Sequence, residues 1–329
     1  MPMARVRGPG HPDQVCDLVA AGIVEEYSRR DPAARLHIRV MGGHGAMFVA
    51  GEVSSTADFD VSAVVRRILG ANGVQTDMEP FIALEPMPPN WACEHGAREG
   101  AVVIGYATNE TVTRLPKQMG LARKVAQLLE KKRLEDEDWF WMDADYEITV
   151  ERVQEKYVTI VRVGHAEAKP LAEVRNIIQQ FLSGAGIPGP IRINPAGEET
   201  RTGLAYRVGS SGRNVSMNSA SSLLPSSPSG IGLHAAHPLN VGGWLARAVA
   251  RECVGRELGQ AIQVSVSWLP LESRPHQLRI RNERGDDLSQ VIDIARFDLR
   301  HIPDVYLKEP HLTQVLQANY QPVELPWEK

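Results

Sequence analysis

The sequence contains little cysteine, few aromatic residues and no excess of positive charge. Its three cysteines among 329 residues, Cys16, Cys93 and Cys253, are too few and too far apart for a disulfide framework or a cysteine metal site, which is typical of a reducing, cytoplasmic compartment. The net charge of -4 offers no basic face to nucleic acid. No apolar run is long enough to cross a membrane or to act as a secretion signal, so we expect neither nucleic acid nor a membrane as a partner.

The composition is that of a globular protein, with alternating helix and strand patterns. Hydrophobic residues make up 43% and charged residues 23% of the chain, enough for more than one core. Apolar spacing predicts helices from Pro12 onward and at 60–69, 117–133 and 174–182, and strands at 35–41, 46–52, 101–107, 146–150 and 158–163. Further strands and helices are expected at 245–254, 262–268, 276–281, 288–294 and 311–316. Residues 209–229, rich in Ser, Gly, Asn and Pro, predict a long mobile loop.

The segment Gly10-His11-Pro12-Asp13 places a histidine and an acid at the start of the first helix. A helix start carries unpaired N–H groups and a partial positive charge, so His11 and Asp13 stand where an anionic ligand and its metal would be held. The same segment is also compatible with an ordinary helix entry, in which Asp13 only complements the helix dipole.

Four further motifs occur in an order and spacing that resemble one family. They are Gly51-Glu52, Gly105-Tyr106-Ala107-Thr108-Asn109-Glu110-Thr111, Ile193-Asn194-Pro195-Ala196-Gly197 and Pro326-Trp327-Glu328-Lys329. With Gly10 to Asp13, they make the chain resemble the S-adenosylmethionine synthetases, also called methionine adenosyltransferases, over nearly its whole length.

The resemblance implies an α+β fold of three similar α/β units about a pseudo-threefold axis, with flat sheets that form a dimer interface. We expect these units at 4–95, 96–203 and 204–329, as interleaved pseudo-repeats of one compact chain. In that family the active site lies between two subunits, so the resemblance implies a homodimer or higher homo-oligomer.

The family's reaction joins the sulfur of methionine to the 5′ carbon of ATP, expels triphosphate and hydrolyses it. Lysines, an arginine, magnesium and potassium surround the phosphates, so the resemblance implies Mg²⁺ here and no organic cofactor. It implies that His11 contacts the leaving oxygen, that Asp13 is a metal ligand and that Glu52 contacts the methionine end. The remaining matches are Glu99 near the substrate amine, Asp143 at the nucleotide and Arg213 at the phosphates.

Several charged positions of the family carry other residues here. Lysines are replaced by Gln14, Asp145, Asn214 and, counting past Pro238, by Ala236 and Asn240, while Gly242 replaces a second magnesium ligand. Arg39 stands in place of a potassium ligand, Glu199 in place of the aromatic that stacks on adenine, and Arg207 in place of the acid that holds the methionine amine. Each replacement taken alone is also compatible with a solvated or structurally paired side chain.

Taken together, the lost cations and the new charges of both signs predict a pocket rebuilt for another ligand, with a carboxylate facing an arginine. We expect an enzyme that acts on an adenosyl- or methionine-type small molecule by displacement at an activated carbon, without the family's handling of triphosphate. Two alternatives stay open at this point. One is a catalytically inactive paralogue that serves as a structural or regulatory partner, and the other is a true synthetase with rearranged phosphate ligands.

Histidines in flexible segments add little to this expectation. His44, His234 and His237 are expected to be solvated loop side chains. His234 and His237 have the spacing of metal ligands only in a helix, and the nearby Gly232 and Pro238 argue against a helix there.

Overall fold

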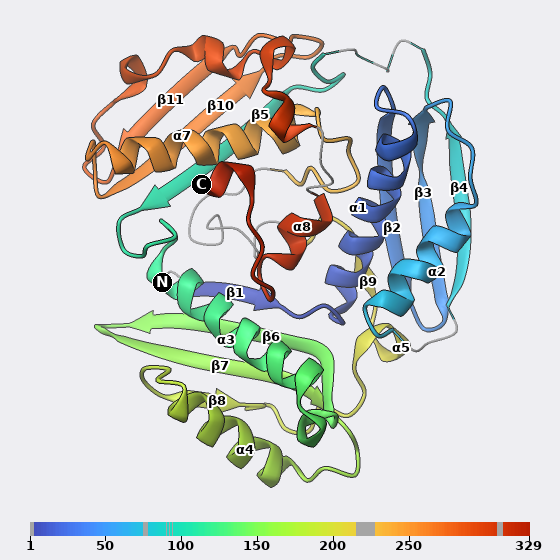
Figure 1. Ribbon diagram of the computed structural model, residues 1–329, viewed down its shortest axis with the longest axis vertical. Coiled ribbons are helices and arrows are strands. Elements are labelled where there is room, and N and C mark those ends of the chain that lie inside the picture. The colour runs from blue at the N-terminus through green and yellow to red at the C-terminus, as the bar shows by residue number, and fades with distance from the viewer. Residues whose placement is uncertain are drawn as a thin grey trace.

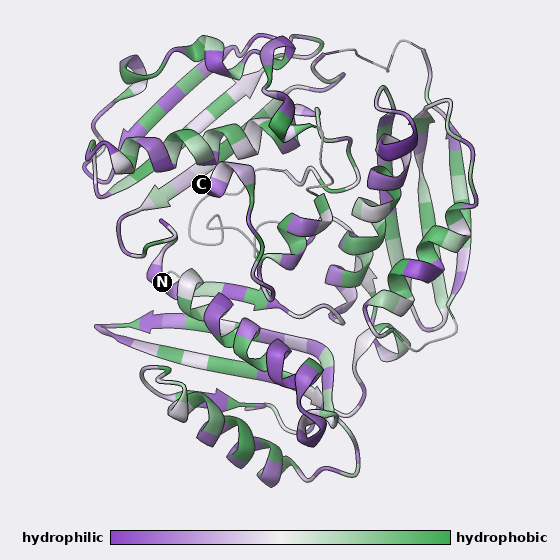
Figure 2. Cartoon of the chain, viewed as in Figure 1, coloured by the Kyte–Doolittle hydropathy of each residue, from purple (hydrophilic) through white to green (hydrophobic). Residues whose placement is uncertain are grey.

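Three small sheets with their helices surround a common centre in the computed structural model of the chain (Figure 1). The structure describes residues 3–74, 78–89, 91, 93, 95–214, 228–307 and 312–329. The expected α+β fold with three similar units is confirmed. Burial alternates along the strands, because the apolar residues on one face of each sheet point toward the helices (Figure 2).

The first sheet has the order β4-β3-β2-β9. Strands β2 (Arg35–Gly43) and β3 (Ala46–Ser54) form a hairpin, β4 (Glu79–Pro86) runs parallel to β3, and β9 (Gly209–Ser210) pairs with β2. Helices α1 (Pro12–Arg30) and α2 (Val61–Ala71) lie on its inner face. Inward residues of β2 such as Leu36 and Ile38 are buried, whereas His37, Arg39 and Met41 point to the outer face.

The second sheet has the order β1-β6-β7-β8 and the third the order β11-β10-β5. The second is built from β1 (Met3–Arg7), β6 (Met142–Val153), β7 (Lys156–His165) and β8 (Ile191–Ile193), with α3 (Lys117–Glu135) and α4 (Leu171–Gly184). The third is built from β11 (Gln277–Asn282), β10 (Ala261–Trp268) and β5 (Ala101–Thr108), with α7 (Gly243–Gly255) against it. Two short helices, α5 (Gly203–Tyr206) and α8 (Leu312–Gln317), complete the fold, and α8 lies near its centre (Figure 1).

Each sheet takes one strand from outside the residue range expected for its unit. Strand β1 joins the central sheet, β5 joins the C-terminal sheet, and β9 joins the N-terminal sheet. Segments far apart in sequence therefore meet in each sheet.

The predicted helices and strands are present except at 288–294. Strands β1, β4, β8 and β9 and helix α5 were not predicted, and β9 lies at the start of the loop expected at 209–229. Residues 288–294 hold two 3₁₀ turns, Ser289–Val291 and Ile294–Phe297, in place of a regular element. Of the loop expected at 209–229, residues 209–214, 228 and 229 are described, and 215–227 lie outside the described residues.

The motif Pro326–Lys329 has a structural role. The Trp327 ring stacks on Trp244 of α7, with ring centroids 4.5 Å apart. Glu328 accepts two hydrogen bonds from the Arg247 guanidinium, at 2.9 and 2.8 Å. Charge-assisted bidentate pairs are the strong ones, so this motif fastens the end of the described chain to α7.

Candidate functional site

The start of α1 is built as the sequence predicted. His11 is the N-cap residue, and its Nδ1 accepts the backbone N–H of Asp13 at 3.2 Å. Because Nδ1 is the acceptor, a neutral His11 carries its proton on Nε2. Both His11 and Asp13 are buried, so neither is the solvated side chain of an ordinary helix entry.

A glycine-rich segment, residues 209–213, crosses the first turn of α1. A Cβ on Gly209 would lie 2.2 Å from the backbone of Pro12, so only glycine allows this approach. The Ser210 N–H donates to Asp13 at 3.0 Å, and the Gly212 N–H donates to Asp17 at 2.6 Å. The carboxylates of α1 therefore bind the protein's own backbone.

Arginines paired with buried carboxylates lie beside His11. We call Arg7, Asp13, Asp145, Arg162 and Arg207 the ion-pair cluster. Arg7 Nη1 lies 2.7 Å from Asp13, while the fully buried Asp145 lies 2.5 Å from Arg162 and 3.0 Å from Arg207. The Gly203 N–H also donates to Asp145, at 2.8 Å. Arg207 is thus paired within the chain, which is the alternative of a structurally paired side chain that the sequence left open.

The other predicted residues of this region join the same cluster. Asn214 accepts a hydrogen bond from Arg7 and donates to Gln14 at 3.2 Å. Asp143 accepts hydrogen bonds from the Thr202 hydroxyl and the Asp145 N–H, where β6 has a register shift. Glu199 lies 3.5 Å from Arg162, the distance of a weak ion pair.

Together with Glu147, Glu199 and Arg213, which pair with it, the ion-pair cluster has balanced charges, four arginines against four carboxylates. Among the described residues, the arginines and their carboxylate partners are Arg7 with Asp13 and Glu147, Arg162 with Asp145 and Glu199, Arg207 with Asp145, and Arg213 with Asp13 at 3.8 Å. Burial first, and then these four guanidiniums, lower the pKa of His11 far below its usual range. His11 is therefore neutral, and little positive charge is left over to hold a polyanion.

The residues at Asp13 do not fit a magnesium ion. One oxygen of Asp13 is taken by Arg7 and the other by the Ser210 N–H, and Mg²⁺ requires oxygen ligands free of such cations. Arg39, in the family's potassium position, is a guanidinium that cannot ligate a cation. Across the described part of the chain, no group of three or more His, Cys, Asp or Glu side chains is arranged to hold a metal.

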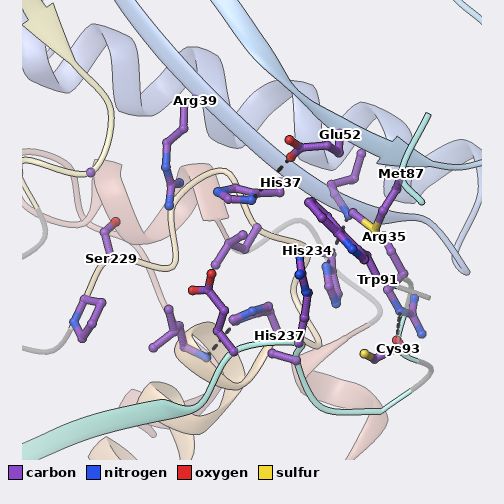
Figure 3. A pocket seen from close by; sticks show the side chains of 18 of the residues that line it. Arg35, His37, Arg39, Glu52, Met87, Trp91, Cys93, Ser229, His234 and His237 are labelled. Carbon is purple, nitrogen blue, oxygen red and sulfur yellow. Dashed lines mark hydrogen bonds and ion pairs between the residues drawn. The ribbon is translucent and has the colours of Figure 1, made fainter. Parts of the chain in front are cut away.

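A pocket of about 560 Å³ opens on the other side of the glycine-rich segment. Four predicted site residues line it: Arg39, Glu52, Glu99 and Arg213 (Figure 3). Trp91 also lines the pocket, and the Arg98 guanidinium lies 3.9 Å from its ring centroid. Side chains of both charge signs beside an aromatic and several aliphatic walls suit a small zwitterionic or polar ligand with an apolar body.

Two loop histidines predicted to be solvated lie in this pocket instead. His234 and His237 both line it, with ring centroids 5.6 Å apart, and both are half-buried. Burial lowers the pKa of His237 to about 4 and that of His234 well below its usual value. The prediction failed because a loop histidine looks alike in sequence whether it faces water or a cavity. His44 is not among the residues that line the pocket.

The predicted site residues thus form two groups, joined at Arg213. His11, Asp13, Asp143, Asp145, Glu199, Arg207 and Asn214 belong to or contact the ion-pair cluster, whereas Arg39, Glu52, Glu99 and Arg213 line the pocket. Sequence reasoning missed Arg7, Arg162 and His37. The sequence held one indication of a role for Arg162: it interrupts the apolar run of β7 between Val161 and Val163.

Asp17, buried beneath the glycine-rich segment, predicts a pH-dependent stability. Burial raises its pKa from an ordinary 3.8 to about 7, although the Gly212 hydrogen bond acts in the opposite direction. Between about pH 4 and 7 the folded protein then binds more protons at Asp17 than the unfolded chain, so this group's contribution to stability is lost as pH rises through 7. Relative to Asp17→Asn, the wild type should lose stability at up to about 1.4 kcal/mol per pH unit in that window.

Urea unfolding at several pH values measures this difference. The variant Glu198→Gln removes an exposed carboxylate and serves as the control. A flat difference for Asp17→Asn would contradict the raised pKa.

The three-unit fold places the chain in the structural class of the S-adenosylmethionine synthetases. A model of the S-adenosylmethionine synthetase N-terminal domain matches residues 4–86, and a model of the S-adenosylmethionine synthetase central domain matches residues 94–197. The chain belongs to the S-adenosylmethionine synthetase family.

Individual relatives agree with this assignment at low identity. The chain is 25% identical to an S-adenosylmethionine synthase 1 of Frankia casuarinae, over 97% of this chain and 94% of that protein. It is 24% identical to the S-adenosylmethionine synthase of Aquifex aeolicus, over 99% and 96% of the two chains. An S-adenosylmethionine synthase of Sorangium cellulosum is also 24% identical, over 88% of this chain and 77% of that protein.

Proposed function

We propose that the protein is an enzyme of this family that acts on a small adenosyl- or methionine-type molecule without holding triphosphate. The observation that carries the proposal is the ion-pair cluster. Where the family has phosphate-binding lysines, this chain has Asp145, which is fully buried and binds Arg162 and Arg207. A triphosphate would have to displace these internal carboxylates, and each buried pair that loses a partner leaves an uncompensated charge.

The retained residues have roles that do not require triphosphate. Glu52 and Glu99 would hold an ammonium group in the pocket, because ionised carboxylates accept only. Arg213, with its side chain 66% exposed at the pocket wall, is free to turn toward an anionic group. The reaction would be a displacement at an activated carbon of a ligand held in the pocket. His11 would take no part in it, because it is buried beside the ion-pair cluster and is not among the residues that line the pocket.

Arg213 gives the sharpest test of this proposal. Arg213→Ala should weaken binding of S-adenosylmethionine, or of a ligand found on the purified protein by native mass spectrometry, by roughly tenfold or more, because a charge-assisted contact contributes about 1.5–3 kcal/mol. Stability should change by no more than about half a kcal/mol, because the Arg213 side chain is exposed and its ion pair with Asp13 is long. Isothermal titration calorimetry and urea unfolding measure the two effects.

Arg201→Ala is the matched control, since Arg201 is exposed and is not among the residues that line the pocket. Arg207 is a poorer probe, because Arg207→Ala also removes a partner of the buried Asp145. Equal affinities in wild type and Arg213→Ala, or no ligand at all, would favour an inactive partner subunit. A stable mixed oligomer with a synthetase that keeps the phosphate-binding lysines would also favour an inactive partner subunit.

We further infer that the protein is a homodimer whose interface covers the outer face of the first sheet. Met41, Phe48 and Phe81 lie side by side there, each 51% exposed, and the two phenylalanine rings stack at 5.0 Å. Exposed apolar patches of this kind mark interfaces. The same face carries Arg39 and Glu52, so a second copy would border the pocket.

Light scattering at micromolar concentration should give a dimer mass for the wild type. Phe48→Asp should shift the mass toward the monomer, because it places a charge opposite Phe81 in the apolar patch. Val112→Asp, a change at a residue that is 98% exposed on another surface, is the control and should stay dimeric. A wild-type monomer would contradict the inference.

We also propose a reducing, cytoplasmic location. Cys16, Cys93 and Cys253 are all free thiols, and two of them are buried. Within the described residues, none of the helices has both the length and the apolar character needed to span a bilayer.

A further inference from the structure

The pocket contains a histidine–carboxylate pair of the kind that serves as a proton acceptor. His37 Nδ1 lies 3.5 Å from an oxygen of Glu52, across the paired strands β2 and β3. Figure 3 shows the His37 ring inside the pocket, joined to Glu52 by the ion-pair line. With Nδ1–H directed at Glu52, a neutral His37 leaves the lone pair of Nε2 for a ligand.

The other two pocket histidines have the opposite tautomer when neutral. The Nδ1 atom of His234 accepts the Leu36 N–H at 3.4 Å, and that of His237 accepts the Leu239 N–H at 3.2 Å. When neutral, both therefore carry their proton on Nε2 and are donors. The pocket combines one imidazole that can accept a proton with two that can only donate a hydrogen bond.

We propose that His37 is a general base, positioned by Glu52, and that the nucleophile bound in the pocket carries an ionisable hydrogen. The substrate class is then a thiol, amine or hydroxyl compound in place of the thioether used by the family. A thioether sulfur has no hydrogen to lose, so a base beside it has no role. This inference rests on the proposed function and names the class of its nucleophile.

The proton transfer is balanced within the pocket. The bond between the nucleophilic atom and its hydrogen breaks, the proton forms a bond with Nε2 of His37, and the electron pair stays on the nucleophile. The resulting imidazolium is stabilised by the Glu52 carboxylate. The freed electron pair then attacks the activated carbon of the proposed displacement.

The charged groups that face His37 allow this role. Arg39 on the same strand disfavours its protonation, whereas Glu52 from β3 and Glu99 from the loop before β5 favour it, and His237 faces it from the loop before α7. Burial and Arg39 together lower the pKa of His37, so its imidazole is neutral at pH 7.

The first experiment is a nuclear magnetic resonance titration of the His37 imidazole in the full chain without ligand. His37→Gln assigns the resonance, and His276→Gln, a change at an exposed histidine outside the pocket, is the control. We expect the Nδ1–H form in the neutral ring and a lower pKa for His37 in Glu52→Gln than in the wild type. The Nε2–H form, or the same His37 pKa in both proteins, would overturn the proposal.

The second experiment compares two probes, L-homocysteine and L-methionine, that differ in the ionisable hydrogen on sulfur. In the wild type, L-homocysteine should shift the Nε2 nitrogen resonance of the neutral His37 ring, because its S–H donates to that nitrogen, and L-methionine should not. Equal shifts with the two amino acids would overturn the proposal. If neither amino acid binds, the proposed function fails on amino-acid ligands, while the ligand-free titration still decides the role of His37.

Discussion

Incubated with ATP, L-methionine, magnesium and potassium, the protein is expected to form S-adenosylmethionine roughly 10⁴-fold more slowly than a synthetase that keeps the phosphate-binding lysines, or not at all. The reason is the loss of positive charge at Gln14, Asp145, Asn214 and Asn240. Each missing contact to a developing anion costs on the order of 3 kcal/mol, or about 10²-fold in rate, and two such losses already give the expected factor. The ion-pair cluster adds to the effect, because its arginines are already neutralised.

Release of phosphate and pyrophosphate, together with chromatographic detection of S-adenosylmethionine, measures this rate. A synthetase that keeps the phosphate lysines, assayed in parallel, shows that the conditions support the reaction. Ordinary synthetase rates from this chain would contradict the expectation and would favour the alternative of a synthetase with rearranged phosphate ligands.

Removal of the Asp145 carboxylate is expected to have the largest effect on stability. Asp145→Ala leaves Arg162 and Arg207 without their shared partner and leaves the Gly203 N–H without its hydrogen-bond acceptor. Breaking a buried pair in this way costs about 3–5 kcal/mol. The free energy of unfolding in urea should fall by that amount, which is a large part of the stability of an ordinary domain.

The matched control is Glu199→Ala, which removes the other carboxylate near Arg162. Glu199 lies 3.5 Å from the guanidinium and is partly exposed, so its loss should cost less than about 1 kcal/mol. A similar small cost for Asp145→Ala would show that the cluster is solvated, and the argument against triphosphate would lose its main support.

Much of the fold could be predicted from sequence because its elements carry strong local patterns. The hairpin of β2 and β3 alternates apolar and polar residues about a glycine turn, and the motif Gly105 to Thr111 placed β5 within a known family. Strand β4, by contrast, begins at Glu79, includes Pro80 and ends at Pro86, which are signals against a strand. It forms because β3 offers it a parallel partner, which local sequence does not show.

The sequence named candidate site residues, but it could not show which side chains each of them contacts. Asp145 and Arg207 each departed from the family pattern, yet their pairing depends on β6 meeting the turn before β9, 62 positions along the chain. His37 looked like any outward residue of a strand. Its role depends on Glu52 standing opposite it and on the loop of His234 and His237 closing the pocket. Such contacts arise from tertiary packing, which periodicity cannot report.

The exchange of strands between the three sheets has a consequence for folding kinetics. Strand β1 pairs with β6, β5 with β10, and β9 with β2, so each sheet closes only across long stretches of chain. Such non-local pairings slow folding, because a large loop must close before any contact stabilises it. The start of α1, Asp145 and the glycine-rich segment come from three distant parts of the chain that these strand pairings bring together. Ligand binding should therefore return in the slowest refolding phase, and no single unit cut from the chain should fold with a working site.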